Sequence, residues 1–215
     1  MRDGAAVQAA ATRRTVGYNT YYTGKLTVTS ELGVIMNLSE YNTMSVFSSW
    51  GVPGSLELKP EITAPGGMIW SVNGVEPSAD AYELMSGTSM AAPQGTGMAA
   101  LVAEEIRNED LLNELDNYTV RHLAQSLLMS TAQPLREEAS GGNYYSILNQ
   151  GAGLARVDLA TTAESFIRMH GIGDGKVKAE LGDDPDRTGE YSFSFDIVNL
   201  NGESLSYTLS ADVLT

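Results

Sequence analysis

A serine within a turn-forming segment is the residue of this chain best suited to chemistry. It is Ser89, in the sequence SGTSMAAP at residues 86–93. Gly87 permits backbone conformations closed to other residues, and the alanines beyond favour a helix, so we expect Ser89 at a helix N-cap. There it would face the positive end of the helix dipole, beside free N–H groups that can stabilise an oxyanion. The segment suits a nucleophilic serine, although a simple N-cap uses the same pattern.

A nucleophilic serine needs a base to accept its proton. The chain has two histidines, His122 and His170, and both follow Ser89. His122 falls on a predicted helix and His170 beside a predicted linker, and we interpret both as structural residues. The residue pattern alone therefore presents a candidate nucleophile without its base.

The composition excludes several classes of protein. With 27 acidic and 13 basic residues the formal net charge is −14, which argues against nucleic acid or an anionic membrane as partner. No apolar run approaches the roughly 18 residues of a membrane span. Cysteine is absent, which excludes disulfides, thiolate zinc sites and cysteine catalysis. The N-terminus has no signal-peptide pattern, so we expect any export signal upstream of Met1.

The elements expected to position Ser89 indicate an α/β protein. The alanine-rich residues 1–15 predict the end of a helix, and residues 25–29 and 34–36 predict short strands. A helix of unusually small residues is predicted from Ser89 to about Ile106, and we expect it to be buried and central. A second helix is predicted by the apolar stripe Val120, Leu123, Ala124, Leu127 and Leu128.

Further along, the period of the apolar pattern changes. A third helix is predicted after Gly153, with Val157, Ala160, Ala163 and Ile167 on one face. Glycines at 171, 173 and 175 predict a linker. Beyond it, residues 191–197 and 205–209 alternate around the turn Asn201-Gly202, which predicts a β-hairpin. A hairpin alone is marginally stable, so we expect it to begin a further β-domain.

The segment around Ser89 closely resembles the serine signature of the subtilases, the subtilisin-like serine peptidases. The similarity rests on GTSMAAP at residues 87–93, followed by Gly97 and Ala100-Leu101. It extends to flanking segments and covers about residues 40–168: FSSWG at 47–51, KPEITAPG at 59–66, Thr131-Ala132, Gly151-Ala152-Gly153 and Val157-Asp158. Gln94 stands where the family usually has a histidine outside the catalytic triad, so this departure leaves the catalytic residues intact.

The resemblance implies a serine endopeptidase that forms an acyl-enzyme on Ser89 and acts on proteins or peptides. The Ser89 N–H and the Thr88 hydroxyl would support the oxyanion. Gly87, Met90 and Pro93 complete the motif, with Met90 beside the nucleophile and open to oxidation. The implied fold is the C-terminal part of a three-layer α/β domain with a parallel sheet. No cofactor is implied; calcium is common in the family, but we interpret the acidic residues 183–186 as a solvated loop.

In subtilases the catalytic aspartate and histidine precede the serine. No histidine precedes Ser89, and none of Asn37, Asn42 and Asn73 lies in the motif of the oxyanion asparagine. We therefore expect the aspartate, histidine and asparagine in an upstream part of the same polypeptide, and we expect this chain alone to be inactive.

The order of the segments resembles the cell-envelope lactocepin and C5a-peptidase-like group, which implies an extracellular or cell-wall location. By this resemblance, residues 1–15 end an inserted protease-associated domain and residues 16–170 form the C-terminal part of the catalytic domain. Residues 176–215 would begin an Fn3-like β-sandwich.

Two alternatives to a peptidase have some support in the sequence. A degenerate subtilase could serve as a binding or scaffold module, but the intact residues 87–89 argue against this. An unrelated esterase would carry Gly-x-Ser-x-Gly, and Ala91 breaks that pattern.

Overall fold

The computed structural model describes residues 12–16, 19–23, 43–52, 54, 56–73, 82–113, 115–137 and 141–212. The chain divides into two units, Met1–Tyr41 and Asn42–Thr215. In the first, strand β1 (Thr12–Val16) pairs antiparallel with β2 (Asn19–Thr23). The predicted helix end is therefore wrong for residues 12–15, because the β-branched residues of TRRTV favour extended pairing. Residues 1–11 and the predicted strands at 25–29 and 34–36 lie outside the described residues.

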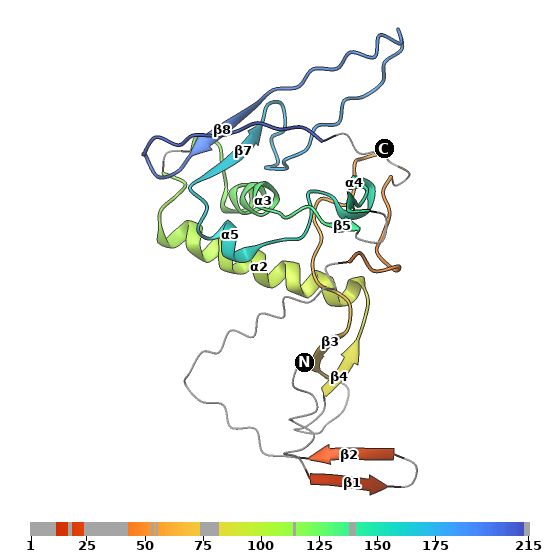
Figure 1. Ribbon diagram of the computed structural model, residues 1–215. Helices are drawn as coiled ribbons and strands as arrows, with labels where there is room; N and C mark the ends of the chain where they lie inside the picture. Colours follow the sequence, from red (N-terminus) through yellow and green to blue (C-terminus); the bar gives the residue numbers. More distant parts are fainter. Residues whose placement is uncertain are drawn as a thin grey trace. The chain divides into compact units, whose positions relative to one another are not determined.

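The second unit contains the segment around Ser89. Its elements in chain order are β3 (Ile69–Val72), β4 (Tyr82–Met85), α2 (Thr88–Asn108), α3 (Val120–Ser130), β5 (Arg136–Glu137), β6 (Asn143–Tyr144), α4 (Ile147–Gln150), α5 (Val157–Ala160), β7 (Ser165–Met169) and β8 (Phe195–Asn199) (Figure 1). The helices predicted from Ser89 and around the 120–128 stripe are both confirmed. Among the helices of the described residues, none combines the length and apolar character needed to cross a membrane.

The core of this unit lies where α3 crosses α2 and contacts β7. The stripe predicted for α3 is largely buried, with Leu123 fully buried and Leu127 2% exposed. Phe166 of β7 is buried against it, and Tyr118 packs its ring on Phe166 with centroids 5.6 Å apart. These contacts fix the C-terminal half of α2.

The expectation that α2 is buried throughout is wrong for the described structure. Its fully buried residues are Val102 and Ile106, both in the C-terminal half. Around Ser89 the helix is mostly exposed, and Leu101 is 53% exposed. Small residues permit close packing but do not supply the packing partner, and α3 and α5 meet only part of this helix.

Two predictions beyond residue 157 are also corrected. The third helix is the single turn α5, because residues 165–169 form β7 instead. The hydroxyls of Thr161 and Thr162 donate to the carbonyls of Val157 and Asp158, and such side-chain bonds compete with helix continuation. The strand predicted within 191–197 is β8, but it pairs antiparallel with β7 rather than with residues 205–209.

The predicted parallel sheet is not seen within the described residues. The sheets there are two-stranded and antiparallel: β1–β2, β3–β4, β5–β6 and β7–β8. One parallel contact occurs, the bridge between Thr63 and Leu154. The mixture of helices and strands agrees with the predicted α/β class. A parallel sheet would need further strands beside residues 61–64, where this bridge occurs.

Candidate active site

Ser89 lies in the first turn of α2 and is exposed. Gly87, not Ser89, is the N-cap residue, and its backbone is extended, so Ser89 is the second residue of the helix. The amides of Met90 and Ala91 donate to the Gly87 carbonyl at 3.0 and 3.3 Å. Within the described residues nothing accepts from the Thr88 or Ser89 amide. The serine hydroxyl therefore lies beside two free N–H donors at the positive end of a 21-residue helix.

The start of α2 is held by the segment that precedes β3. The Gly87 amide donates to the Gly66 carbonyl at 2.8 Å. The Met68 amide donates to the Ser86 hydroxyl oxygen, also at 2.8 Å. A Cβ at Gly66 would lie 2.7 Å from the Gly87 oxygen and 3.0 Å from the Ala91 Cβ. Only glycine allows the backbone to approach the nucleophile turn this closely.

We predict that Gly66→Ala lowers kcat/KM of the complete polypeptide about 100-fold, because a shift of the nucleophile by about 1 Å costs this much. The added Cβ must push the Gly87 carbonyl away, and Ser89 moves with the start of α2. Steady-state hydrolysis of a peptide substrate measures the effect. Gly173→Ala is the matched control, because a Cβ at Gly173 meets no heavy atom within 4 Å. Equal activity of the two variants would contradict the prediction.

Three segments singled out by their resemblance converge beneath this turn. The Thr63 amide donates to the Gly153 carbonyl, and the Ala155 amide donates to the Thr63 carbonyl, both at 2.8 Å. Gln133 and Leu154 exchange amide–carbonyl bonds of 2.9 and 2.8 Å. Segments 59–66, 131–133 and 151–155 therefore form one hydrogen-bonded support for Gly66.

Gln150 completes this support from inside. Its side chain is 1% exposed. The amide oxygen accepts from the Leu135 amide at 2.7 Å, and the amide nitrogen donates to the Tyr145 carbonyl at 2.7 Å. A buried amide with both ends paired fixes the backbone on either side of it.

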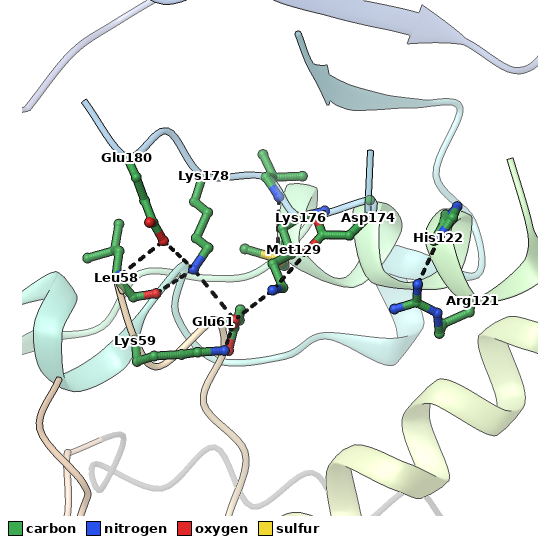
Figure 2. Close-up of polar contacts among 12 residues, drawn as sticks. Leu58, Lys59, Glu61, Arg121, His122, Met129, Asp174, Lys176, Lys178 and Glu180 are labelled. Atoms are coloured by element: carbon green, nitrogen blue, oxygen red, sulfur yellow. Dashed lines mark hydrogen bonds and ion pairs between the residues drawn. The ribbon is translucent and has the colours of Figure 1, made fainter. Parts of the chain in front are cut away.

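A group of charges lies beside the same support. Glu61 accepts a hydrogen bond from Lys59 in an ion pair, and its Oε1 lies 3.6 Å from the Nζ atoms of both Lys176 and Lys178 (Figure 2). Burial by itself raises the pKa of the Glu61 carboxyl, but the hydrogen bond and charge of Lys59 and the two other lysines hold the pKa below its ordinary value. The ionised form of Glu61 is therefore the stable form in the folded protein.

Lys178 connects the group to the C-terminal segment. Its Nζ donates to the Leu58 carbonyl at 2.6 Å and pairs with Glu180 at 2.8 Å (Figure 2). The Glu180 carboxylate in turn accepts from the Leu58 amide at 3.1 Å. Residues 176–180 are thus fastened to residues 58–61, next to the segment that ends at Gly66.

We predict that Glu61→Gln lowers the free energy of unfolding by about 1–2 kcal/mol at neutral pH. Because the folded pKa of Glu61 is lowered, its contribution is present above the unfolded pKa and is lost as the pH falls through the folded value. The difference between wild type and variant should therefore shrink from about pH 5 to about pH 3. Urea unfolding at both pH values measures it, with Glu104→Gln on the exposed face of α2 as control. A difference that does not change with pH would contradict the prediction.

The two histidines are engaged away from Ser89. The His122 ring lies 2.8 Å from the Arg121 guanidinium (Figure 2) and edge-on to Tyr118. The His170 ring lies 2.9 Å from a carboxylate oxygen of Asp196. Hydrogen bonds from Arg168 and then from His170 hold the pKa of Asp196 below its ordinary value. Among the described residues neither ring contacts Ser89, and these contacts are consistent with a structural role for both histidines.

Three asparagines and Thr88 were the other residues connected with oxyanion support. Asn73 donates to Glu83 at 3.0 Å, whereas Asn37 and Asn42 lie outside the described residues. The Thr88 hydroxyl is exposed beside Ser89, and its role in oxyanion support stays a prediction.

The family resemblance makes calcium a possible ligand of the acidic residues. In the acidic stretch at 183–186, Asp184 accepts hydrogen bonds from the Thr188 and Gly189 amides, as in a local turn. No three acidic or histidine side chains converge on a metal position anywhere in the described residues.

Sequence reasoning missed the residues that hold the nucleophile turn. Gly66 belonged to a segment with recognised resemblance, but its contact with Gly87 needs the fold. Ser86 was included in the motif string without a role. The ion pairs of Glu61 with Lys176 and Lys178 join residues more than a hundred positions apart, so no local sequence pattern predicts them.

Comparison with known proteins agrees with this geometry. A sequence profile of the subtilase family matches residues 6–164. The chain is 36% identical over 125 residues to a PII-type proteinase of Lactococcus lactis subsp. cremoris, which covers 56% of this chain and 6% of that protein. It is 35% identical over 128 residues to a C5a peptidase of Streptococcus pyogenes serotype M18, which covers 58% of this chain and 10% of that protein. The chain thus spans a small part of the length of these relatives. Because the profile covers most of its residues, the chain belongs to the subtilase family.

Proposed function

We propose that this chain carries the nucleophile of a serine endopeptidase that cleaves proteins through an acyl-enzyme on Ser89. The observation that carries the proposal is the exposed Ser89 hydroxyl at the start of α2, beside the Thr88 and Ser89 amides, which have no acceptor among the described residues. After the Ser89 oxygen attacks the peptide carbonyl, these amides are suited to stabilise the oxyanion. The similarity to a PII-type proteinase and a C5a peptidase supports the same reaction class.

The proton of Ser89 must go to a base outside these 215 residues. No histidine precedes Ser89, and the two that follow it are engaged elsewhere. We propose that the histidine and aspartate, with the oxyanion asparagine, come from an upstream part of the same polypeptide. The isolated chain would then be inactive. By similarity to its relatives, the proposed location is extracellular or on the cell wall.

The domain boundaries are part of the proposal. Residues 16–170 would be the C-terminal part of the catalytic domain, and residues 1–15 would end an inserted protease-associated domain. An Fn3-like domain beginning within 176–215 is proposed from the alternating sequence pattern alone, since β8 pairs with β7 of the catalytic part.

The test compares the isolated chain with the complete polypeptide that carries it. A fluorophosphonate probe should label Ser89 in the complete polypeptide, and a protein substrate such as casein should be cleaved. The isolated chain should do neither. Hydrolysis by the isolated chain would overturn the account of the base. A complete polypeptide that binds protein without cleaving it would favour the alternative, a subtilase-like binding or scaffold module.

A further inference from the structure

The hairpin β3–β4 presents an apolar face with no partner among the described residues. In its antiparallel register Trp70 lies opposite Leu84, and Val72 lies opposite Tyr82. Directly opposed residues share a face, as do residues two apart on one strand. All four side chains therefore lie on the same face. They are 63, 45, 68 and 51% exposed in the order named, and all are uncharged.

Two of these side chains form a flat aromatic surface. The rings of Trp70 and Tyr82 are stacked, with centroids 6.0 Å apart and planes inclined by 13°. Stacking fixes the two rings relative to each other in advance, so less side-chain entropy is lost when another group packs on them. Tryptophan and tyrosine are also the residues that most often dominate the energy of binding surfaces.

This face is fixed close to the nucleophile. Leu84 precedes Ser89 by five residues, so the chain between them spans at most about 17 Å. The base of the hairpin is bonded to the nucleophile turn at two points, from Met68 to Ser86 and from Gly87 to Gly66. An extended peptide advances about 3.3 Å per residue, so the apolar face lies within about five substrate residues of the reacting carbonyl.

The outer edges of the hairpin suit an extended chain. Within the described residues, the outer edges of β3 and β4 make no backbone–backbone hydrogen bond. Such an edge pairs readily with an added strand, whose side chains then alternate between the two faces. The other face bears Ser71 and Glu83 between Ile69 and Met85, so it is mixed in polarity and lacks an aromatic pair.

We propose that the face formed by Val72, Trp70, Tyr82 and Leu84 binds apolar side chains of an extended polypeptide substrate that flank the bond cleaved at Ser89. The proposal rests on the peptidase function proposed above and adds the class of substrate. Substrates with alternating leucine or phenylalanine near the cleaved bond are preferred over polar sequences.

The experiment measures binding without cleavage. The complete polypeptide is prepared in its Ser89→Ala form, and fluorescence anisotropy follows a fluorescein-labelled peptide of about 12 residues in which leucine or phenylalanine alternates with threonine. A control peptide replaces each leucine and phenylalanine by serine. Trp70→Ala should weaken binding of the apolar peptide at least about tenfold, and Tyr82→Ala about fivefold. Binding of the serine peptide should be weak and unchanged by either substitution.

Matched controls are Phe193→Ala and Tyr207→Ala, whose rings are 59 and 50% exposed elsewhere in the chain. The proposal is overturned if Trp70→Ala weakens binding no more than Phe193→Ala does. It is also overturned if Trp70→Ala strongly destabilises the complete polypeptide to urea, which would show that its own chain covers the face. Dissociation of a dimer by Trp70→Ala would overturn it in favour of a second copy. This experiment measures binding and does not depend on cleavage. If the proposed peptidase function were wrong, the wild-type polypeptide would fail to hydrolyse substrate, which is a separate measurement.

Discussion

Replacing Ser89 by alanine in the complete polypeptide is expected to lower kcat for a peptide substrate roughly 10⁶-fold. The substitution removes the only atom that forms the acyl-enzyme in the proposed mechanism, and no neighbouring hydroxyl has the same position at the start of α2. Thr88 is adjacent in sequence, but consecutive helix residues do not face the same direction. The loss should appear in kcat with little change in KM, because the small side chain is not expected to contribute to ground-state binding.

The measurement is steady-state hydrolysis of a chromogenic peptide together with labelling by a fluorophosphonate. Ser192→Ala is the control, because Ser192 is exposed and lies within residues 176–215, outside the proposed catalytic part. Hydrolysis by Ser89→Ala within tenfold of wild type would refute the role of Ser89 as nucleophile. Unchanged labelling by the probe would locate the reactive serine elsewhere.

Replacing Gly153 by alanine is expected to cost about 3 kcal/mol or more of stability. Gly153 has φ +120°, a region that side chains rarely adopt. A Cβ there would lie 2.4 Å from the Gln133 carbonyl oxygen and 2.6 Å from the Pro134 nitrogen. Gln133 cannot move away without loss of hydrogen bonds, because its amide and carbonyl are both bonded to Leu154. The substitution therefore breaks the support that carries Thr63 and, beyond it, Gly66.

The loss of stability at Gly153 has two contributions, the strained backbone conformation and the clash of the added Cβ. Gly141→Ala separates them. Gly141 also has positive φ, +81°, but a Cβ there meets no heavy atom within 4 Å. Its substitution should cost only the left-handed conformation, about 1–2 kcal/mol. Urea unfolding followed by circular dichroism measures both variants. Similar losses for the two would show that the close approach at Gly153 contributes nothing.

The sequence by itself was sufficient for the family, the candidate nucleophile and the two main helices. The family can be recognised because the catalytic turn and its flanking segments are contiguous sequence motifs, such as GTSMAAP at 87–93. The helices from Ser89 and around Leu123 can be predicted because the spacing of apolar residues and residue size are also local properties of the sequence. The same patterns placed the N-cap at Ser89, two residues after its actual position at Gly87, and Ser89 lies in the first turn of the helix.

Tertiary contacts decided what local pattern could not. Residues 165–169 fit a helical stripe by sequence, yet they form β7, because pairing with β8 and burial of Phe166 outweigh a weak local preference. The small residues of α2 permit burial, but burial depends on which elements reach the helix.

The approach of Gly66 to Gly87 and the ion pairs of Glu61 with Lys176 and Lys178 likewise join distant parts of the chain. Residue types therefore determined which chemistry Ser89 can perform. The long-range hydrogen bonds and contacts determined how that serine is held, because they depend on where distant segments meet.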